Sequence, residues 1–235
     1  MEMVLHKANT RGHANHGWLD SWHSFSFGAY YDPNRLHFGA LRVLNDDTVV
    51  GGAGFGKHPH DNMEIISIPL EGELEHGDSL GNVQVIKKGD VQVMSAGTGV
   101  VHSEKNRSQL LPVRFLQIWV FPNQKGVTPR YDQQNFKDEA LHNQLATIVA
   151  PMGSGQGVQI HQEAWFSLGK LDAGLELEYP LKKDGNGVYA FLIEGDVTIN
   201  DIVLNRRDGL GLTATNPLRI KANMTSELLL IEVPV

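Results

Sequence analysis

The sequence predicts an all-β protein with two similar β domains in one chain. The first observation behind this prediction is a regular pattern. From Leu36 to Val120, apolar runs of four to six residues alternate with Gly, Asn and Asp. Short runs separated by turn residues are typical of β-sandwiches and β-barrels. The runs cover residues 41–44, 65–68, 83–86, 91–94 and 115–120.

The second observation is that the C-terminal half repeats the first half. Three of its segments resemble three segments of the first half, and they follow one another in the same order. The pairs are 188–197 with 65–74, 206–210 with 87–91, and 227–234 with 114–122. Repeated similarity in one order indicates a duplicated β domain.

The predicted domain boundaries follow from this repeat. We expect an N-terminal domain at 1–125, a linker at 126–145 and a C-terminal domain at 146–235, sizes that a chain of 235 residues allows. Residues 122–144 are polar and include Pro129 and clustered charges. They therefore predict a linker with one short helical turn around 138–144.

The composition excludes several classes of protein. The net charge of −7 does not favour a nucleic-acid-binding surface. The absence of cysteine excludes disulfides and thiolate metal sites. The first seven residues lack the apolar core of a signal peptide, and no run of 18 apolar residues occurs. A soluble, cytoplasmic protein without a membrane span is expected.

Two short motifs predict a metal site. His58-Pro59-His60 lies in one predicted strand, and His102-Ser103-Glu104 lies in another. Alternate residues of a strand point to the same face, so each motif directs two ligand side chains the same way. Three imidazoles and one carboxylate on neighbouring strands form a suitable cage for a divalent transition metal.

The N-terminal segment 9–33 contains several further histidines among aromatic residues and glycines. No pair in it has the spacing of metal ligands. We therefore expect its aromatic side chains to pack on a sheet.

The motifs resemble those of the pirin family, within the cupin superfamily. Gly52-x5-His58-x-His60-x3-Glu64 is similar to the first cupin motif, and Gly99-x2-His102-x3-Asn106 to the second. The segments 55–60, 70–76 and 95–104 agree with pirins in detail, and the resemblance covers the whole chain. It implies an all-β bicupin fold, with two jelly-roll β-barrels in one chain. It also implies His58, His60, His102 and Glu104 as metal ligands.

The generic cupin pattern offers a different fourth ligand, Glu64. Four residues of straight strand span about 13 Å, which places Glu64 too far from His60 for a shared ion unless the chain bends. Glu104 is one pleat repeat from His102, about 6.6 Å between α-carbons, a gap that side chains close. We therefore expect Glu104 as ligand and keep Glu64 as the alternative, or as a supporting residue.

The second copy lacks these ligands. The positions that correspond to His58 and His60, counted back from the glycine Gly195, hold Leu181 and Lys183. A lysine ammonium repels a cation, so we expect a metal-free C-terminal domain and one metal ion per chain.

The resemblance is strongest to bacterial pirins described as quercetin 2,3-dioxygenases. It implies a metal-dependent dioxygenase that cleaves the C-ring of flavonols such as quercetin with O2 and releases CO. Fe(II) is the expected metal, with Ni, Co, Mn, Cu and Zn also compatible with the ligand set. Glu104 is the expected catalytic residue, as acceptor of the substrate's hydroxyl proton. Four aromatic or thioether side chains are candidates to line the pocket: Phe55, Met63, Phe115 and Trp119.

Two other functions stay open. Pirins of animals also resemble the sequence and are described as nuclear co-regulators, so a metal-binding, redox-sensing regulator is the alternative, although no basic nuclear-localisation run is present. A small-molecule oxidase with broad specificity is the other. The expected partners are a flavonol and O2, with no nucleic acid and no membrane. Because the duplication pairs two barrels within one chain, we expect a monomer.

Overall fold

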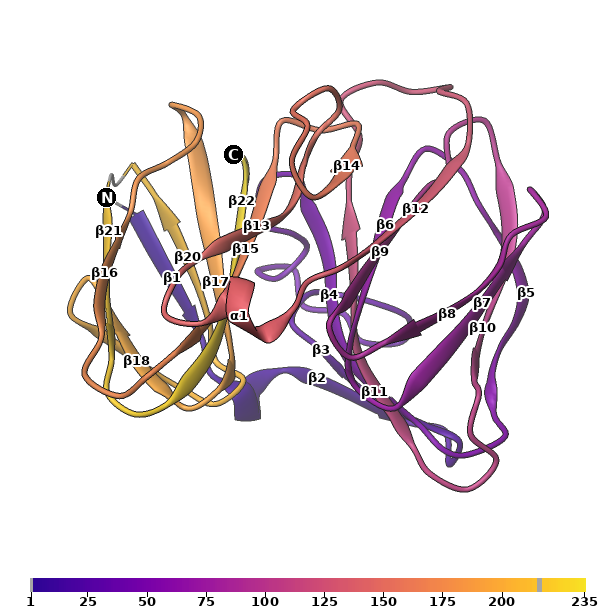
Figure 1. The fold of residues 1–235 in the computed structure, drawn as a ribbon, viewed down its shortest axis with the longest axis horizontal. Helices are drawn as coiled ribbons and strands as arrows, with labels where there is room; N and C mark the ends of the chain where they lie inside the picture. The colour runs from indigo at the N-terminus through magenta and orange to yellow at the C-terminus, as the bar shows by residue number, and fades with distance from the viewer. Residues whose placement is uncertain (1, 215–216) are drawn as a thin grey trace.

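The computed structural model describes residues 2–214 and 217–235. The chain forms two domains side by side, and each domain combines a seven-stranded sheet with a four-stranded sheet (Figure 1). The predicted all-β architecture of two barrels in one chain is confirmed. Within the described residues, no helix has the length and hydropathy needed to cross a bilayer.

The first domain contains most of the N-terminal half. Its large sheet has, in spatial order, β12 (Arg130–Asn135), β9 (Asp90–Ser95), β6 (Glu64–Glu71), β11 (Val113–Val120), β4 (Leu41–Val49), β3 (Leu19–His23) and β2 (Gly12–Asn15). Its small sheet has the order β5 (Gly54–His60), β10 (Val100–Asn106), β7 (Glu73–Asp78) and β8 (Val83–Lys87).

The second domain repeats this arrangement. Its large sheet has the order β1 (Glu2–His6), β20 (Gly209–Thr213), β17 (Asn186–Glu194), β22 (Ser226–Pro234), β15 (Trp165–Leu171), β13 (Ala146–Pro151) and β14 (Val158–Ile160). Its small sheet has the order β16 (Glu176–Tyr179), β21 (Leu218–Ala222), β18 (Asp196–Ile199) and β19 (Ile202–Asn205). The repeated segments occupy equivalent places, since β17 lies beside β22 as β6 lies beside β11.

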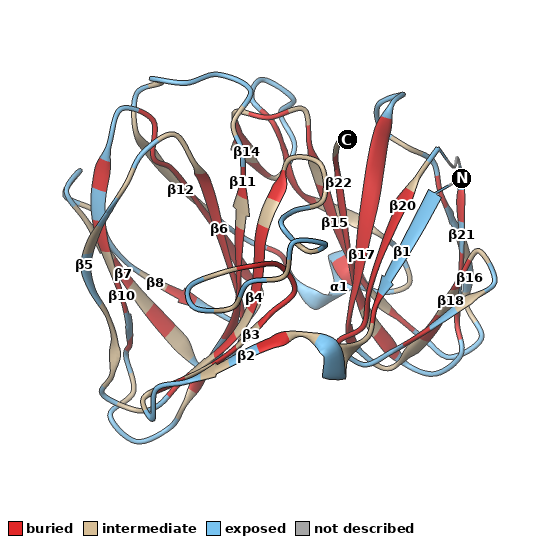
Figure 2. Cartoon of the chain, turned by 180° about the vertical axis from the view of Figure 1, so that it is seen from behind, coloured by how far each residue is buried: buried red, intermediate tan, exposed pale blue. Residues whose placement is uncertain are grey.

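The largest core cluster lies between the two large sheets and contains residues of both domains (Figure 2). Strand β17 shows why its sequence is apolar throughout. Tyr189 and Phe191 point into this shared core, whereas Val188 and Ala190 point into the interior of the second barrel. A strand that is covered on both faces requires apolar residues at every position.

Two strands depart from the predicted domain boundaries. Strand β1, within the predicted N-terminal domain, pairs with β20 of the second domain. Strand β12, within the predicted linker 126–145, pairs with β9 of the first domain. The physical reason is the same in both cases, because each strand supplies hydrogen bonds to an otherwise open sheet edge. The helical elements are a 3₁₀ turn, η1 (Ala8–Thr10), and α1 (Asp138–Leu141), which lies within the range 138–144 predicted as a helical turn.

Candidate metal centre

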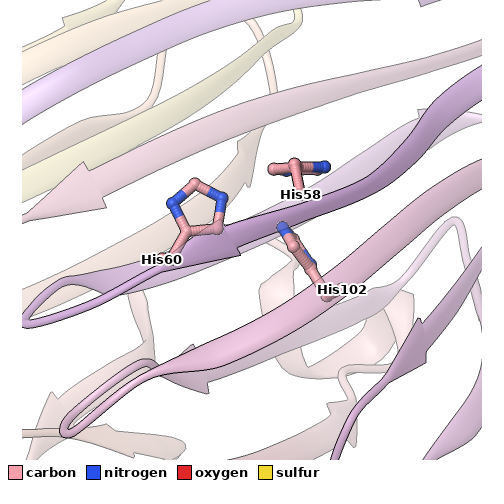
Figure 3. Close-up of side chains that lie close together, drawn as sticks. All are labelled: His58, His60 and His102. Atoms are coloured by element: carbon pink, nitrogen blue, oxygen red, sulfur yellow. The ribbon is translucent and has the colours of Figure 1, made fainter.

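The candidate metal centre lies on the neighbouring strands β5 and β10. They pair antiparallel, with His58 opposite His102 and His60 opposite Val100. Gly52, the first motif glycine, has φ of 74° in the turn that leads into β5, a conformation that favours glycine. The three imidazole rings converge (Figure 3), and one ring nitrogen of each lies within 4.8 Å of the other two. The structure thus brings three of the four predicted ligands together.

The ring nitrogens are available for a metal ion. His58 Nδ1 donates a hydrogen bond to the Gly56 carbonyl at 2.7 Å, so its Nε2 keeps a free lone pair. His60 Nε2 and both ring nitrogens of His102 are buried without a hydrogen-bond partner in the described part of the chain. Each such atom costs about 1–3 kcal/mol when it stays unpaired. A coordinated ion would supply the missing partner, so these residues fit a divalent transition metal.

The protonation state of the cluster also suits metal binding. Burial, followed by repulsion from the neighbouring imidazoles, lowers the pKa of His102 to about 2. Burial and the adjacent His58 lower the pKa of His60 to about 4. Neutral imidazole is the form that binds metals. Both side chains are therefore neutral near pH 7 and release no proton when a metal binds.

Glu104, the fourth predicted ligand, lies outside this group of three but lines the same cavity as His58 and His60. Its buried carboxylate accepts hydrogen bonds from Ser67 Oγ at 3.1 Å and from Gln117 Nε2 at 3.4 Å. These contacts hold it in the cavity wall. Burial raises the pKa of Glu104 to about 7. The carboxyl can therefore exchange a proton near neutral pH.

Glu64, the alternative ligand, lies on the opposite face of β6. Ile66, of the same parity, belongs to the core between the domains, whereas Ser67 reaches Glu104. The Glu64 carboxylate accepts a hydrogen bond from Ser95 Oγ at 2.6 Å and does not line the cavity. This placement separates Glu64 from the imidazole cluster.

The cavity beside the metal cluster has a volume of about 370 Å³, within the usual range for small-molecule sites. Phe55 and Trp119 line it as predicted from the sequence. Met63 and Phe115 do not: Phe115 is fully buried in one apolar cluster of the first domain, and Met63 packs against another. The ring centroids of His60 and Trp119 are 5.0 Å apart, so an aromatic wall begins directly beside the cluster.

Sequence reasoning did not single out Ser67 and Gln117, which hold Glu104. A signal for them exists, since each is a lone polar residue within an apolar strand, Ile65-Ile66-Ser67-Ile68 and Leu116-Gln117-Ile118. A buried polar side chain requires a hydrogen-bond partner, and here that partner is the site carboxylate.

The N-terminal segment has a larger role than packing alone. Its strands β2 and β3 extend the large sheet, in agreement with the predicted packing of this segment on a sheet. However, six residues of 9–33 besides Ala14 and Leu19 also line the cavity: His16, Ser21, His23, Phe27, Gly28 and Ala29. Ser21 donates a hydrogen bond to Asp47 on β4 and lies 2.8 Å from His23 Nε2. We expected no metal ligand in this segment. Within it, His23 Nε2 forms a hydrogen bond with Ser21.

In the second domain, Leu181 and Lys183 lie beyond the end of β16, the strand that takes the place of β5 in the small sheet. Lys183 Nζ forms an ion pair with Glu163 at 3.2 Å, and Leu181 packs against the apolar interior of the barrel. The nearby Glu232 carboxylate is fully buried and accepts bonds from the Lys182 and Lys183 amides at 2.9 and 3.0 Å. The strands that take the places of β5 and β10, β16 and β21, direct apolar side chains into the interior of the second barrel.

Comparison with known proteins agrees with this duplicated architecture. Residues 4–120 match the family model Pirin, and residues 147–233 match the model of the quercetinase C-terminal cupin domain. The chain is 43% identical over 242 residues to a quercetin 2,3-dioxygenase of Escherichia coli strain K12, with 99% of both chains covered. It is 38% identical over 222 residues to a pirin-like protein of Caulobacter vibrioides, which covers 94% of this chain and 95% of that relative.

The solved structures agree with the sequence comparison. The crystal structure of the bacterial pirin YhhW from Escherichia coli in complex with nickel(II) has a TM-score of 0.94 and 41% sequence identity, and 99% of each chain is covered. Similarity of this extent holds across both domains and the junction between them. The chain therefore belongs to the pirin family, with two cupin domains in one chain.

Proposed function

We propose that the chain is a metal-dependent dioxygenase that cleaves the C-ring of flavonols such as quercetin with O2 and releases CO. The observation that carries this proposal is a cavity lined by His58, His60 and the buried carboxylate of Glu104, with His102 converging on the other two imidazoles. The relatives named quercetin 2,3-dioxygenase support the substrate class.

His58, His60 and His102 would hold the ion, and Glu104 is the proposed fourth ligand. Fe(II) is the proposed native metal, and the nickel(II) complex of the related pirin supports a divalent ion in this family. When bound, such an ion supplies Lewis-acid chemistry to the adjacent 3-hydroxyl and 4-carbonyl oxygens of a flavonol.

The chain's own residues then bind the substrate and move its proton. Glu104 accepts the 3-hydroxyl proton, which its pKa of about 7 permits near neutral pH. Ser67 and Gln117 fix the carboxylate in the cavity wall. Phe55 and Trp119 provide flat apolar surfaces for the aromatic rings and exclude water from the reacting end.

The experiment is aerobic turnover of quercetin with CO detection, repeated with the metal-free protein reloaded with each divalent metal in turn. CO release that depends on the metal supports the proposal. The double variant His58→Ala/His60→Ala is expected to lose stoichiometric metal and all turnover, because two of the converging ligands are removed. Full metal occupancy in that variant would refute the metal site. Metal binding without CO release would refute the dioxygenase and favour the regulator.

A further inference from the structure

A second polar cluster lines the cavity from the large sheet, whereas the imidazoles lie on the small sheet. Its members lie on β3 and β4, where Ser21 pairs with Asp47 and His23 pairs with Asn45. Alternate residues of paired strands share a face, so all four side chains belong to one wall. All four line the cavity, and none is more than 3% exposed. We call this set the β3–β4 wall.

The hydrogen bonds of the β3–β4 wall run in one direction. The Ser21 hydroxyl has one hydrogen and donates it to the Asp47 carboxylate. Ser21 Oγ must therefore accept from His23 Nε2, which lies 2.8 Å away and carries the ring hydrogen. The neutral ring of His23 then presents Nδ1 as a bare acceptor. A serine that donates to the carboxylate rather than to the imidazole is not arranged as an acyl-transfer triad.

The wall has more acceptors than the protein satisfies. His23 Nδ1 and Asn45 Oδ1 are buried without a partner in the described part of the chain. The only hydrogen bond to the Asp47 carboxylate within that part comes from Ser21. Buried polar atoms normally have a partner, and unpaired ones are costly. A group that brings O–H donors into this cavity would satisfy them.

Aromatic rings connect the wall to the metal cluster. His23 and Phe27 are 5.3 Å apart, Phe27 and Trp119 are 5.4 Å apart, and Trp119 and His60 are 5.0 Å apart, measured between ring centroids. Each pair meets edge to face. This row of rings gives the cavity an apolar aromatic side, against which a planar ligand that reaches from the imidazoles to the wall can pack.

We propose that the β3–β4 wall recognises phenolic hydroxyl groups on the ring of the substrate that lies farthest from the metal. This inference rests on the proposed function, because it assumes that the chelating end of a flavonol lies at the imidazoles. It adds that Ser21, His23, Asn45 and Asp47 select hydroxylated aromatic rings over bare ones. A site that satisfies its buried polar groups only through substrate hydroxyls rejects analogues that lack them.

The test is anaerobic binding of two flavonols to the full-length, Ni(II)-loaded protein, followed by flavonol absorption. Quercetin carries further ring hydroxyls, whereas 3-hydroxyflavone keeps only the chelating pair. The wild-type protein is expected to bind quercetin at least ~10-fold more tightly than 3-hydroxyflavone, since two or more hydrogen bonds separate the complexes. The variant Asn45→Leu is expected to reduce this preference by ~5-fold or more, and Ser21→Ala is expected to act in the same direction.

A matched control is Gln92→Leu. Gln92 is also a buried amide of the first domain, and neither of its polar atoms has a partner among the residues that the structure describes, yet it does not line the cavity. Its substitution is expected to leave the preference unchanged. Equal binding of the two flavonols by the wild-type protein would overturn the inference even if every variant failed to fold. An unchanged preference in Asn45→Leu would also overturn it. Selective binding through Asn45 without turnover of quercetin would support the wall and refute only the proposed dioxygenase.

Discussion

Replacement of Glu104 by glutamine tests the proposed division of labour between two buried carboxylates. Glu104 is 3% exposed and Glu64 is 1% exposed, and each accepts a hydrogen bond from one serine. Burial raises the pKa of both. They differ in position, because only Glu104 lines the cavity. Glu64→Gln is therefore a matched control for Glu104→Gln.

The expected effect on activity is large at one position and small at the other. Glutamine at 104 keeps one oxygen for Ser67 but cannot accept the substrate proton. Loss of a general base typically reduces the rate by ~10²–10⁴. A neutral amide is also a weaker metal ligand. Glu64→Gln is expected to reduce the rate by less than ~10-fold, since its side chain faces the other domain.

The expected effect on stability has the opposite sign. A carboxyl whose folded pKa lies near 7, above its usual value of 4.5, stabilises the fold fully only below pH 4.5. That contribution is lost as the pH rises through about 7. By pH 8 the loss of unfolding free energy amounts to about 3 kcal/mol. An amide does not ionise, so Glu104→Gln is expected to make the metal-free protein more stable than wild type at pH 8, by up to that amount.

The assays are quercetin turnover with saturating metal, metal content, and urea unfolding of the metal-free protein at pH 8. An inactive, metal-free Glu64→Gln beside an active Glu104→Gln would show that the generic cupin ligand applies here. A Glu104→Gln protein that is inactive and also unfolded at pH 8 would refute the reasoning about the buried charge.

Three further predictions concern stability and assembly. Burial, with Arg35 nearby, lowers the pKa of His6 to about 4, and its Nδ1 lies 3.0 Å from the Tyr189 hydroxyl. The stability that His6 contributes is full above pH 6.5 and is lost as the pH falls towards 4. Between pH 7 and pH 5, His6→Phe should therefore lose ~2 kcal/mol less unfolding free energy than the wild type, measured by urea titration. An equal dependence of unfolding free energy on pH in the two proteins would contradict this. Glu232→Leu should cost about 3 kcal/mol or more, measured by urea unfolding, because it leaves the buried Tyr179 hydroxyl and two backbone amides unpaired. A loss below 1 kcal/mol would contradict it. Light scattering should give a monomer of 26.0 kDa, since the two large sheets already cover each other within one chain, and a dimer mass that persists on dilution would contradict this.

The sequence predicts those features that depend on local pattern. Apolar runs and turn residues predict the strands, and the alternation of β-structure brings His58, His60 and His102 to one place. The H-x-E motif also places Glu104 at the cavity. It does not predict the rotamer, which depends on Ser67 and Gln117 from two other strands.

Features set by long-range pairing could not be predicted in this way. Asn45 and Asp47 read as ordinary polar residues of a strand, and nothing local indicates that β3 will bring Ser21 and His23 beside them. The local sequence likewise does not predict the partner of β1, since the paired strand is more than 200 residues away in the chain. Register between distant strands is decided by tertiary packing.

The position of β1 has a consequence for the way the protein is made. Met3 and Val4 are synthesised more than 200 residues before their partners Leu212 and Gly211. Until β20 has been synthesised, β1 therefore lacks the strand with which it pairs, while the nascent first domain assembles. Exposed strand segments of this kind are a risk for aggregation. β1 can pair with β20 only after residues 209–213 have been synthesised, so a chain that stalls before residue 209 cannot complete the large sheet of the second domain.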